Sequence, residues 1–341
     1  MTVLYVGLDT GSSTCHQVVM RPDGQITTSR RFPTGEAHLI DAFTGLGGQL
    51  HVHLEAGELA PWVRGVIAPL AQRVAISHPP ANAWIAKDPN KRDRVDAAKL
   101  ADLLRVNRVH EAYYAEGRSR RDFKQLVRHY DDLTAQQVRL KQKIKARLRT
   151  QGVITRGQQL FAPKGRAAVL DKVPSPELRE SILRLYELLD RALSTQPAAQ
   201  KLMLRAAGSF PEIESFKAVP GIGPVGACRF SAYVQTPHRF SNVRKLWRYC
   251  RLGVSRRSCG GKLLSHPGLG PAGCGRLKDV TRKAFDAAPR RKDDNMFKRA
   301  YARALESTHD KTHARLSVQR KFVSVLRAMR LTLSPYRGES G

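Results

Sequence analysis

VLYVGLDTGS, residues 3–12, is the stretch that decides the fold of this chain. A short apolar run ends in a carboxylate and then breaks at glycine, which is typical of a buried strand whose last residue, Asp9, lies at the edge of a sheet. A second apolar run ends the same way, because residues 51–57 read HVHLEAG and place Glu55 at the strand end. We therefore expect two carboxylates at neighbouring strand ends.

A pair of acids follows at Asp93 and Asp96. Residues three apart on a helix share a face, so both carboxylates would point the same way. One alternative is that Asp93 caps the helix while Asp96 stabilises its dipole in the first turn, and capping is compatible with metal binding. Carboxylate oxygens are the ligands that hard divalent cations prefer. Together with the two strand-end acids, the pair predicts a divalent-metal site that acts on nucleic acid.

Composition supports a polyanionic partner. The chain has 341 residues and a net charge of +30, and so one-sided a surface repels itself unless a polyanion such as DNA or RNA neutralises it. No run approaches the roughly 20 apolar residues of a membrane span, and no signal-peptide pattern opens the chain, so we expect a cytoplasmic protein. Five cysteines without a CxxC pair argue against a disulfide framework and a zinc knuckle.

The order of predicted elements indicates an α/β domain at the N-terminus. Three meandering strands precede strands that alternate with helices, which is the order of a ribonuclease-H-like domain. The predicted elements are strands 2–9, 17–20 and 26–32, helix 35–46, strand 49–55, helix 58–73, strand 74–77 and helix 95–104.

Two long amphipathic helices are expected next. The first carries an apolar heptad over residues 122–148, which is typical of a coiled coil, and the second covers residues 178–193. They pair either as a hairpin or as a dimer interface. Basic residues gather at 141–149, either as a solvated face or as a nucleic-acid contact. The heptad positions are Phe123, Leu126, Tyr130, Leu133, Leu140 and Ile144, with Gln137 as the polar interruption.

A second, mainly helical domain begins near Phe210. Residues 219–224 read VPGIGP, which predicts a helix-hairpin-helix whose glycines, Gly221 and Gly223, let backbone amides approach a phosphate closely. A plain tight turn between two helices is the alternative. The glycine spacing and the apolar flanks favour the helix-hairpin-helix.

Two basic segments follow it. Residues 240–251 form a basic helix with aromatic residues, in which Arg244 and Lys245 are candidate nucleic-acid contacts. Residues 255–262 read SRRSCGGK, and Arg256, Arg257 and Lys262 are further candidates. A serine among arginines before a glycine pair is either a phosphate cradle or a nucleophile whose developing charge the arginines stabilise.

With these segments in hand, the chain resembles the DEDD-type insertion-sequence transposases, the family numbered one-ten, over nearly its whole length. The four acids together with the C-terminal block in this order are specific, whereas any one motif alone is not. The motifs that carry the resemblance are GLD at 7–9, LEAG at 54–57, DRVDA at 93–97, VPGIGP at 219–224, SCGGK at 258–262 and GRLK at 275–278.

The resemblance implies three domains: a RuvC-like DEDD catalytic domain at 1–115, a coiled-coil connector at 120–200 and a C-terminal transposase domain at 210–335. It also implies that Asp9, Glu55, Asp93 and Asp96 bind the metal. The family serine stands directly before glycine, but that position holds Cys259 in this chain.

Ser258, one residue earlier, is therefore the first candidate for the nucleophile. Cys259 and Ser255 are the alternatives.

The implied activity is DNA transposition, with Mg²⁺ as cofactor and a covalent serine–DNA intermediate. A guide (bridge) RNA that pairs with donor and target DNA, and an assembly of two dimers, are further implications of the resemblance. Two rival functions remain open: a junction-resolving nuclease that uses the acids alone, and a non-catalytic nucleic-acid-binding protein in which the acids serve as helix caps.

Overall fold

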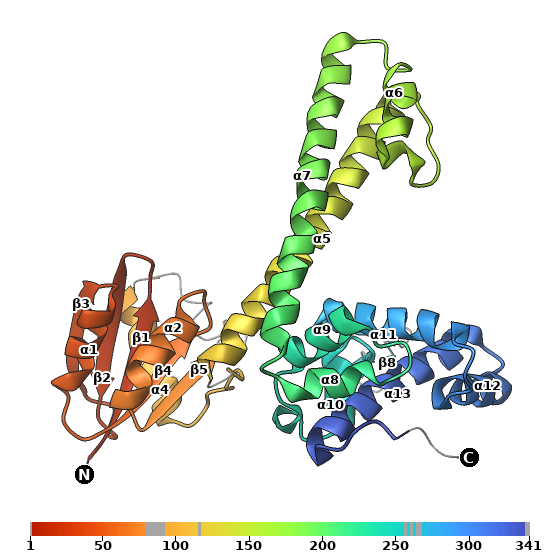
Figure 1. The fold of residues 1–341 in the computed structure, drawn as a ribbon. Helices are drawn as coiled ribbons and strands as arrows, with labels where there is room; N and C mark the ends of the chain where they lie inside the picture. The colour runs from red at the N-terminus through yellow and green to blue at the C-terminus, as the bar shows by residue number, and fades with distance from the viewer. Residues whose placement is uncertain are drawn as a thin grey trace. The chain divides into compact units, whose positions relative to one another are not determined.

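The structure is a computed structural model that describes residues 2–78, 93–114, 117–255, 258–259, 262–263 and 268–337. The chain divides into two compact units, Met1–Tyr114 and Ala115–Gly341. Figure 1 shows the first unit as a sheet with helices and the second as a mainly helical body that carries a long helical hairpin.

Unit 1 is built on a five-stranded mixed sheet in the order β3-β2-β1-β4-β5. The first three strands form an antiparallel meander, whereas β4 lies parallel to β1 and β5 parallel to β4. The predicted order of strands and helices is therefore present, and the sheet fits a ribonuclease-H-like domain. The strands are β1 (Val3–Thr10), β2 (Thr14–Met20), β3 (Ile26–Pro33), β4 (Gln49–Glu55) and β5 (Arg73–Ser77).

Helices cover both faces of this sheet. Alternate residues such as Val6, Leu8 and Leu54 form a core with α1 (Glu36–Thr44) and α2 (Ala60–Ile67), and the 3-10 turn η1 (Ala68–Leu70) follows α2. The opposite face packs against α4 (Asp93–Arg105), which contacts β1, β2 and β4. A side chain at Gly7 would overlap the carbonyl oxygen of Ala97, so this glycine lets α4 lie close to β1.

A buried histidine ties α4 to the parallel strands. His53 Nδ1 donates to the Leu100 carbonyl of α4 over 2.8 Å, which leaves Nε2 to accept from the Ser77 hydroxyl of β5 at 2.7 Å. Burial lowers the pKa of His53, so the ring is neutral and can play both parts. These bonds fix the helix on the face of the sheet toward which Gly7 and His53 point.

The two long helices of unit 2, α5 (Arg118–Thr150) and α7 (Pro176–Ala207), pack against each other as a hairpin (Figure 1). Gln137, the polar interruption of the heptad, is buried, and its Nε2 donates to the Ala192 carbonyl of α7 over 3.0 Å. The apolar face of α5 is thus covered by α7 of the same chain. Of the two expected pairings, a hairpin or a dimer interface, this surface forms the hairpin.

The far end of the hairpin has a core of its own. Leu140, Ile144 and Leu148 of α5 pack there with Ile182 and Tyr186 of α7. The short helices η3 (Gln159–Phe161) and α6 (Pro163–Leu170) complete this core. These short helices have few apolar residues, and those residues are buried because they pack on the hairpin. The local sequence pattern therefore does not reveal the two helices.

The remaining helices form a body around the largest core of the chain. The base of α5 contributes Phe123 and Val127 to it, and Phe297 stacks on Phe322 with ring centroids 3.7 Å apart. The helices are α8 (Pro211–Lys217), α9 (Pro224–Val234), η4 (Pro237–Arg239), α10 (Val243–Tyr249), α11 (Gly275–Ala287), η5 (Ala288–Arg290), α12 (Met296–Thr308) and α13 (Lys311–Thr332). Among the described residues, no helix has the length and apolar character needed to cross a membrane.

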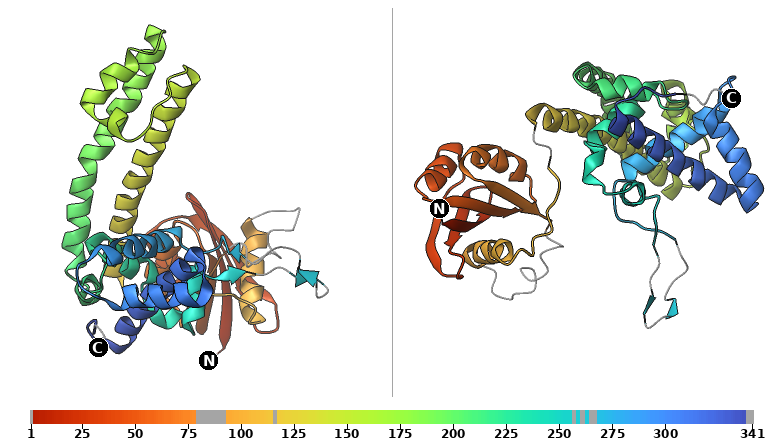
Figure 2. Two further views of the ribbon diagram at one scale, coloured as in Figure 1. Left: turned by 90° about the vertical axis from the view of Figure 1, so that its right-hand side faces the viewer. Right: turned by 90° about the horizontal axis from the view of Figure 1, so that it is seen from below.

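Short strands between α10 and α11 form a ribbon. β6 (Val254–Ser255) pairs antiparallel with β9 (Gly268–Leu269), and β7 (Ser258–Cys259) pairs antiparallel with β8 (Lys262–Leu263). In Figure 2 the β7 and β8 arrows lie away from the helices of unit 2.

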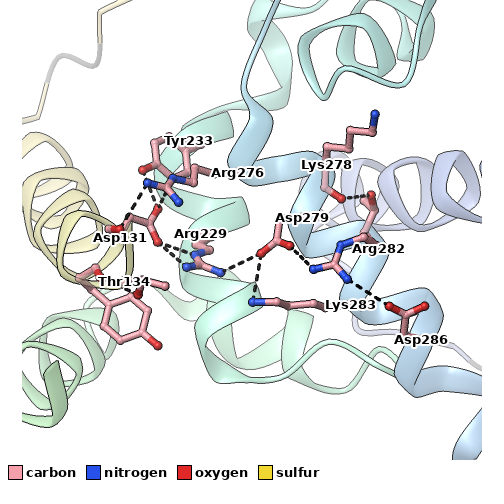
Figure 3. Close-up of polar contacts among 12 residues, drawn as sticks. Asp131, Thr134, Arg229, Tyr233, Arg276, Lys278, Asp279, Arg282, Lys283 and Asp286 are labelled. Carbon is pink, nitrogen blue, oxygen red and sulfur yellow. Dashed lines mark hydrogen bonds and ion pairs between the residues drawn. The ribbon is translucent and has the colours of Figure 1, made fainter. Parts of the chain in front are cut away.

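A buried ionic network joins the base of α5 to α9 and α11 (Figure 3). Asp131 of α5 accepts from Arg229 Nε at 2.7 Å and from the Tyr233 hydroxyl at 2.8 Å, and Arg276 lies 3.7 Å away. Arg229 reaches on to Asp279 at 3.5 Å. The network fixes the hairpin to the helical body, because Arg229, Tyr233 and Arg276 would all lose Asp131 if α5 moved.

Candidate metal centre and nucleic-acid interface

The strand register places Asp9 and Glu55 at the same edge of the sheet. Leu8 pairs with Leu54 in the parallel ladder of β1 and β4, so the two acids that follow lie side by side near the ends of neighbouring strands. Side chains alternate along a strand, and Asp9 and Glu55 therefore share the sheet face of Gly7 and His53, which is the face covered by α4.

The first turn of α4 supplies the other two acids. Asp93 and Asp96 both lie in that turn, and Ala97, against which Gly7 packs, follows directly. Asp96 Oδ1 is buried and has no hydrogen-bond partner among the described residues. A buried carboxylate oxygen without a partner is costly in a folded protein, so this atom points to a missing ligand.

Asp9 is electrostatically coupled to each of the other three acids. The pKa of Asp9 is raised from 3.8 to about 6, and burial is the largest cause. The charges of Asp93, Asp96 and Glu55 come next, in that order, while a hydrogen bond from the Thr10 backbone opposes them. Like charges that crowd one site raise a carboxyl pKa in this way, and a bound cation would reverse the effect.

The donor set fits a hard divalent cation, which takes carboxylate oxygens. The orphaned Asp96 oxygen and the mutual repulsion at Asp9 both favour such an ion. Within the described residues, however, no three acid, histidine or cysteine side chains are already arranged as a metal site. Asp9 is thus coupled to the other three acids, although the four are not gathered as a ready-made metal site in the described residues.

His16 is a neighbour of this cluster that the sequence pattern does not single out. It pairs with Asp9 across β1 and β2, and its ring Nε2 lies 3.1 Å from the Ser29 hydroxyl. Burial lowers the pKa of His16, and the charge of Asp93 opposes that shift. The one feature that connects His16 with the acid cluster is its position opposite Asp9 in the meander. That position can be recognised only when the strand register is known.

The candidate nucleophile lies in unit 2. Ser258 is the first residue of β7 and pairs with Leu263 of β8, while Cys259 pairs with Lys262. The alternative Ser255 donates its hydroxyl to the Gly268 carbonyl over 3.3 Å, across the neighbouring pair of strands. This bond gives Ser255 a structural role in the ribbon. Arg256 and Arg257 lie outside the described residues.

The turn between α8 and α9 contains the glycines of the predicted helix-hairpin-helix. Gly221 has a φ of +86°, and a side chain there would overlap the carbonyl oxygen of Ala284 in α11. Close packing against α11 is therefore enough to explain why a glycine is needed at this position, and no bound phosphate has to be invoked. Gly223 precedes α9 with open space around it and borders a pocket of about 310 Å³ that Arg229 and Lys283 also line.

The basic helix α10 is anchored on one side and exposed on the other. Leu246 is buried, and Trp247 Nε1 donates to the Arg320 carbonyl of α13 over 3.2 Å. Asn242 caps the helix by accepting from the Lys245 backbone at 3.0 Å. Arg244 and Lys245 reach solvent on this helix, so both can contact a polyanion.

A sheet that fits a ribonuclease-H-like domain, with four acids at one edge, is typical of enzymes that process nucleic acid, and comparison with known families agrees. Residues 6–151 match a transposase model of DEDD enzymes from IS110 elements, and residues 213–302 match the Transposase IS116/IS110/IS902 family. No curated protein matches the chain. The chain belongs to the IS110 family of insertion-sequence transposases.

Membership of this family makes the protein a DNA strand-transfer enzyme with DNA as its substrate. The DEDD domain suggests dependence on a divalent metal.

Proposed function

We propose that the acid cluster of Asp9, Glu55, Asp93 and Asp96 binds Mg²⁺ and that Ser258 forms a covalent link to DNA during transposition. The observation that carries the metal site is the strand register that sets Asp9 beside Glu55 on the sheet face covered by α4, whose first turn holds Asp93 and Asp96. Burial and then the charges of these three acids raise the pKa of Asp9 to about 6. When bound there, a divalent cation supplies charge neutralisation and polarises a phosphoryl oxygen.

The residues around the cluster position it. Gly7 allows α4 to approach β1, and His53 holds α4 through its bond to Leu100. Asp9 and Glu55 come from adjacent strands of a rigid sheet, so their backbone positions vary little. Asp96 contributes an oxygen that has no hydrogen-bond partner among the described residues, so it can offer a lone pair to an incoming cation.

The covalent step assigned to Ser258 conserves the number of phosphoester bonds. The serine Oγ forms a bond to phosphorus while the bond from phosphorus to one sugar oxygen breaks. The hydroxyl proton leaves Oγ, and the freed sugar oxygen takes up a proton. Because one ester replaces another, the reverse reaction with a new sugar hydroxyl rejoins DNA without a further energy source.

The charge of the chain supports a guide RNA as a further part of this proposal. A net charge of +30 is larger than contacts with one duplex require, and a bridge RNA paired with DNA would add phosphates to neutralise it. Assembly into dimers or a tetramer also belongs to the proposal. For the heptad face of α5 an intrachain partner is already present, so an assembly would use another surface.

A nicked suicide substrate that traps the covalent state tests the serine. We expect an adduct that survives denaturing gels with the wild type and with Cys259→Ser, and none with Ser258→Ala. Asp9→Asn should bind DNA and form no adduct. If Ser258→Ala still cuts DNA by water-dependent hydrolysis and loses only rejoining, the protein is a junction-resolving nuclease. If Asp9→Asn supports full strand exchange, the acids have no catalytic part.

A further inference from the structure

The half of the α5–α7 hairpin that lies farther from the helical body carries an excess of positive charge that its fold does not require. Between Leu133 and Leu170 the chain contains nine lysines and arginines and no acidic residue. Within the described residues, the only ion pair that this segment makes is that of Arg166 with Asp190 of α7. Among the described residues, the other cations of this segment pair with no carboxylate, in contrast to Arg184 on α7, which pairs with Glu180 and Glu187.

These cations follow the helix in rows. Arg139, Lys143 and Arg147 are exposed and recur every four residues, so each step advances about 6 Å along one side of α5. On the other side, Lys141 and Lys145 stand over the ring of Phe161 at 5.1 and 5.5 Å. The two rows therefore lie on opposite sides of the buried face of α5, and the exposed row of Arg139, Lys143 and Arg147 is available to a polyanion.

An exposed apolar side chain lies in the turn just beyond these rows. Ile154 is 82% exposed, the highest value among the large apolar residues of the described structure. Gly152 and Gly157, both with positive φ, enclose the turn, and a side chain added at either position would meet nothing within 4 Å. Val153 is buried in the core at the end of the hairpin, so the turn is anchored directly beside Ile154.

We propose that the end of this hairpin is a DNA-binding arm, in which Arg139, Lys143 and Arg147 contact duplex phosphates and Ile154 inserts into the minor groove. Proteins that bend DNA through the minor groove combine cationic contacts with an apolar wedge, and isoleucine is among the residues used. The proposed occupant is duplex DNA because the chain is a DNA strand-transfer enzyme.

The charge argues against the other occupants of such a surface. A second copy of the same segment would bring a second set of unpaired cations against the first, which would repel. An ordinary solvated helix face normally carries both signs, as the ion-paired face of α7 does at Arg184. The arm lies in unit 2 and uses neither the acid cluster nor Ser258, so its failure and theirs are distinguishable.

Salt-dependent binding of the full chain to a linear DNA duplex tests the phosphate contacts. The triple variant Arg139→Gln, Lys143→Gln, Arg147→Gln should lower the slope of log K against log salt by about 2.7, since each phosphate contact contributes about 0.9. Arg184→Gln is the matched control and should leave the slope unchanged. A triple variant with the wild-type slope would overturn the proposal, provided that its thermal unfolding is also that of the wild type.

The proposed insertion of Ile154 into the minor groove is tested by a separate measurement. Duplexes that carry 2-aminopurine report unstacking by a rise in fluorescence, and donor and acceptor dyes at the duplex ends report bending. Ile154→Ser should lose both signals and keep the wild-type salt slope, Ile154→Leu should retain both, and Leu188→Ser, an exposed leucine on α7, should behave as wild type.

Unchanged unstacking and bending in Ile154→Ser would overturn the insertion. A preference of the arm for duplex RNA over DNA, or a change in the sedimentation of the free protein in the triple variant, would assign the surface to RNA or to a second copy and overturn the DNA proposal.

Discussion

Asp131 of α5 and Arg229 of α9 form an ion pair that is almost wholly withdrawn from solvent. The side chains are 1% and 4% exposed, and Arg229 Nε donates to Asp131 Oδ1 over 2.7 Å. Tyr233 donates to the second carboxylate oxygen, and its pKa is raised by burial and by the charge of Asp131. The aspartate therefore has a hydrogen-bond donor on each of its oxygens in a place where water cannot replace them.

Asp131→Leu should destabilise unit 2 by about 3–5 kcal/mol, because it leaves the buried Arg229 charge without its closest partner. The double variant with Arg229→Met should recover part of that loss. Glu180→Ala, which removes an exposed ion pair of α7, is the control and should cost at most about 0.5 kcal/mol. Urea unfolding followed by helical circular dichroism measures all three. Equal midpoints for Asp131→Leu and Glu180→Ala would show that the buried network is not what fixes α5.

Divalent metal should stabilise unit 1 through the acid cluster. Binding to the folded state alone raises the melting temperature, and here it also relieves repulsion between Asp9 and its neighbours. We expect millimolar Mg²⁺ or Mn²⁺ to raise the melting temperature of the wild type by a few degrees and to leave that of Asp9→Asn unchanged.

In the absence of metal, Asp9→Asn should be at least as stable as the wild type, because it removes a repelled charge. Asp41→Asn, an exposed acid of the same unit, is the control and should keep the full metal response. A metal response that survives in Asp9→Asn would place the cation elsewhere.

Lys124 of α5 should give the chain a pH-dependent stability. Burial lowers its pKa from 10.5 to about 8, and the nearby charges of Arg128 and Arg239 act in the same direction, against a small opposite effect of Cys274. The folded state therefore binds fewer protons than the unfolded chain between about pH 8 and 10.5. Stability from this group rises with pH over that window, and the cost of charged Lys124 is fully present below the folded-state pKa.

Lys124→Met should therefore be more stable than the wild type by about 2 kcal/mol at pH 7, which is less than the full shift implies because part of the side chain meets solvent. The difference should shrink as the pH approaches that of the free lysine. Lys143→Met, an exposed lysine of the same helix, should show no such trend. Thermal unfolding at a series of pH values from neutral to alkaline checks this, and a difference that is independent of pH would mean that packing, not charge, separates the variants.

The sheet and its acids are predictable because their signals are local. Asp9 and Glu55 each end an apolar run, and a strand end is visible in a short stretch of sequence. The heptad of α5 is visible for the same reason, although Val127 and Asp131 replace Leu126 and Tyr130 at its most buried positions near the base. There the helix packs into the helical body as well as against α7, so its buried face is set by a second partner.

The contacts that fix the site cannot be found in the sequence because they join distant residues. Nothing near Asp131 marks it as buried, since its partners lie about a hundred residues later. The motif around Gly221 suggests that this glycine lets the backbone approach a phosphate, yet the group packed closely against it is Ala284 of α11. The local motif predicts a turn, whereas the residues that pack against this turn are determined by the whole fold.

Gly7 should prove essential to the acid cluster although it carries no functional group. A methyl group at this position would overlap the Ala97 carbonyl, so Gly7→Ala must push α4 away from β1. Overpacking of this kind costs about 1–3 kcal/mol or more. It should also move Asp96, which precedes Ala97, away from Asp9, so that the metal-induced rise in melting temperature falls or disappears. Gly57→Ala, where a side chain meets nothing within 4 Å, should change neither quantity.

Melting temperatures with and without Mn²⁺ give both readouts of Gly7→Ala in one experiment. The decisive comparison is between Gly7→Ala and Asp9→Asn. Both should lose the metal response, but only Gly7→Ala should be destabilised without metal, because it strains the packing of α4, whereas Asp9→Asn removes a repulsion. If Gly7→Ala kept the wild-type stability and metal response, the close approach of α4 to β1 would not be what assembles the four acids.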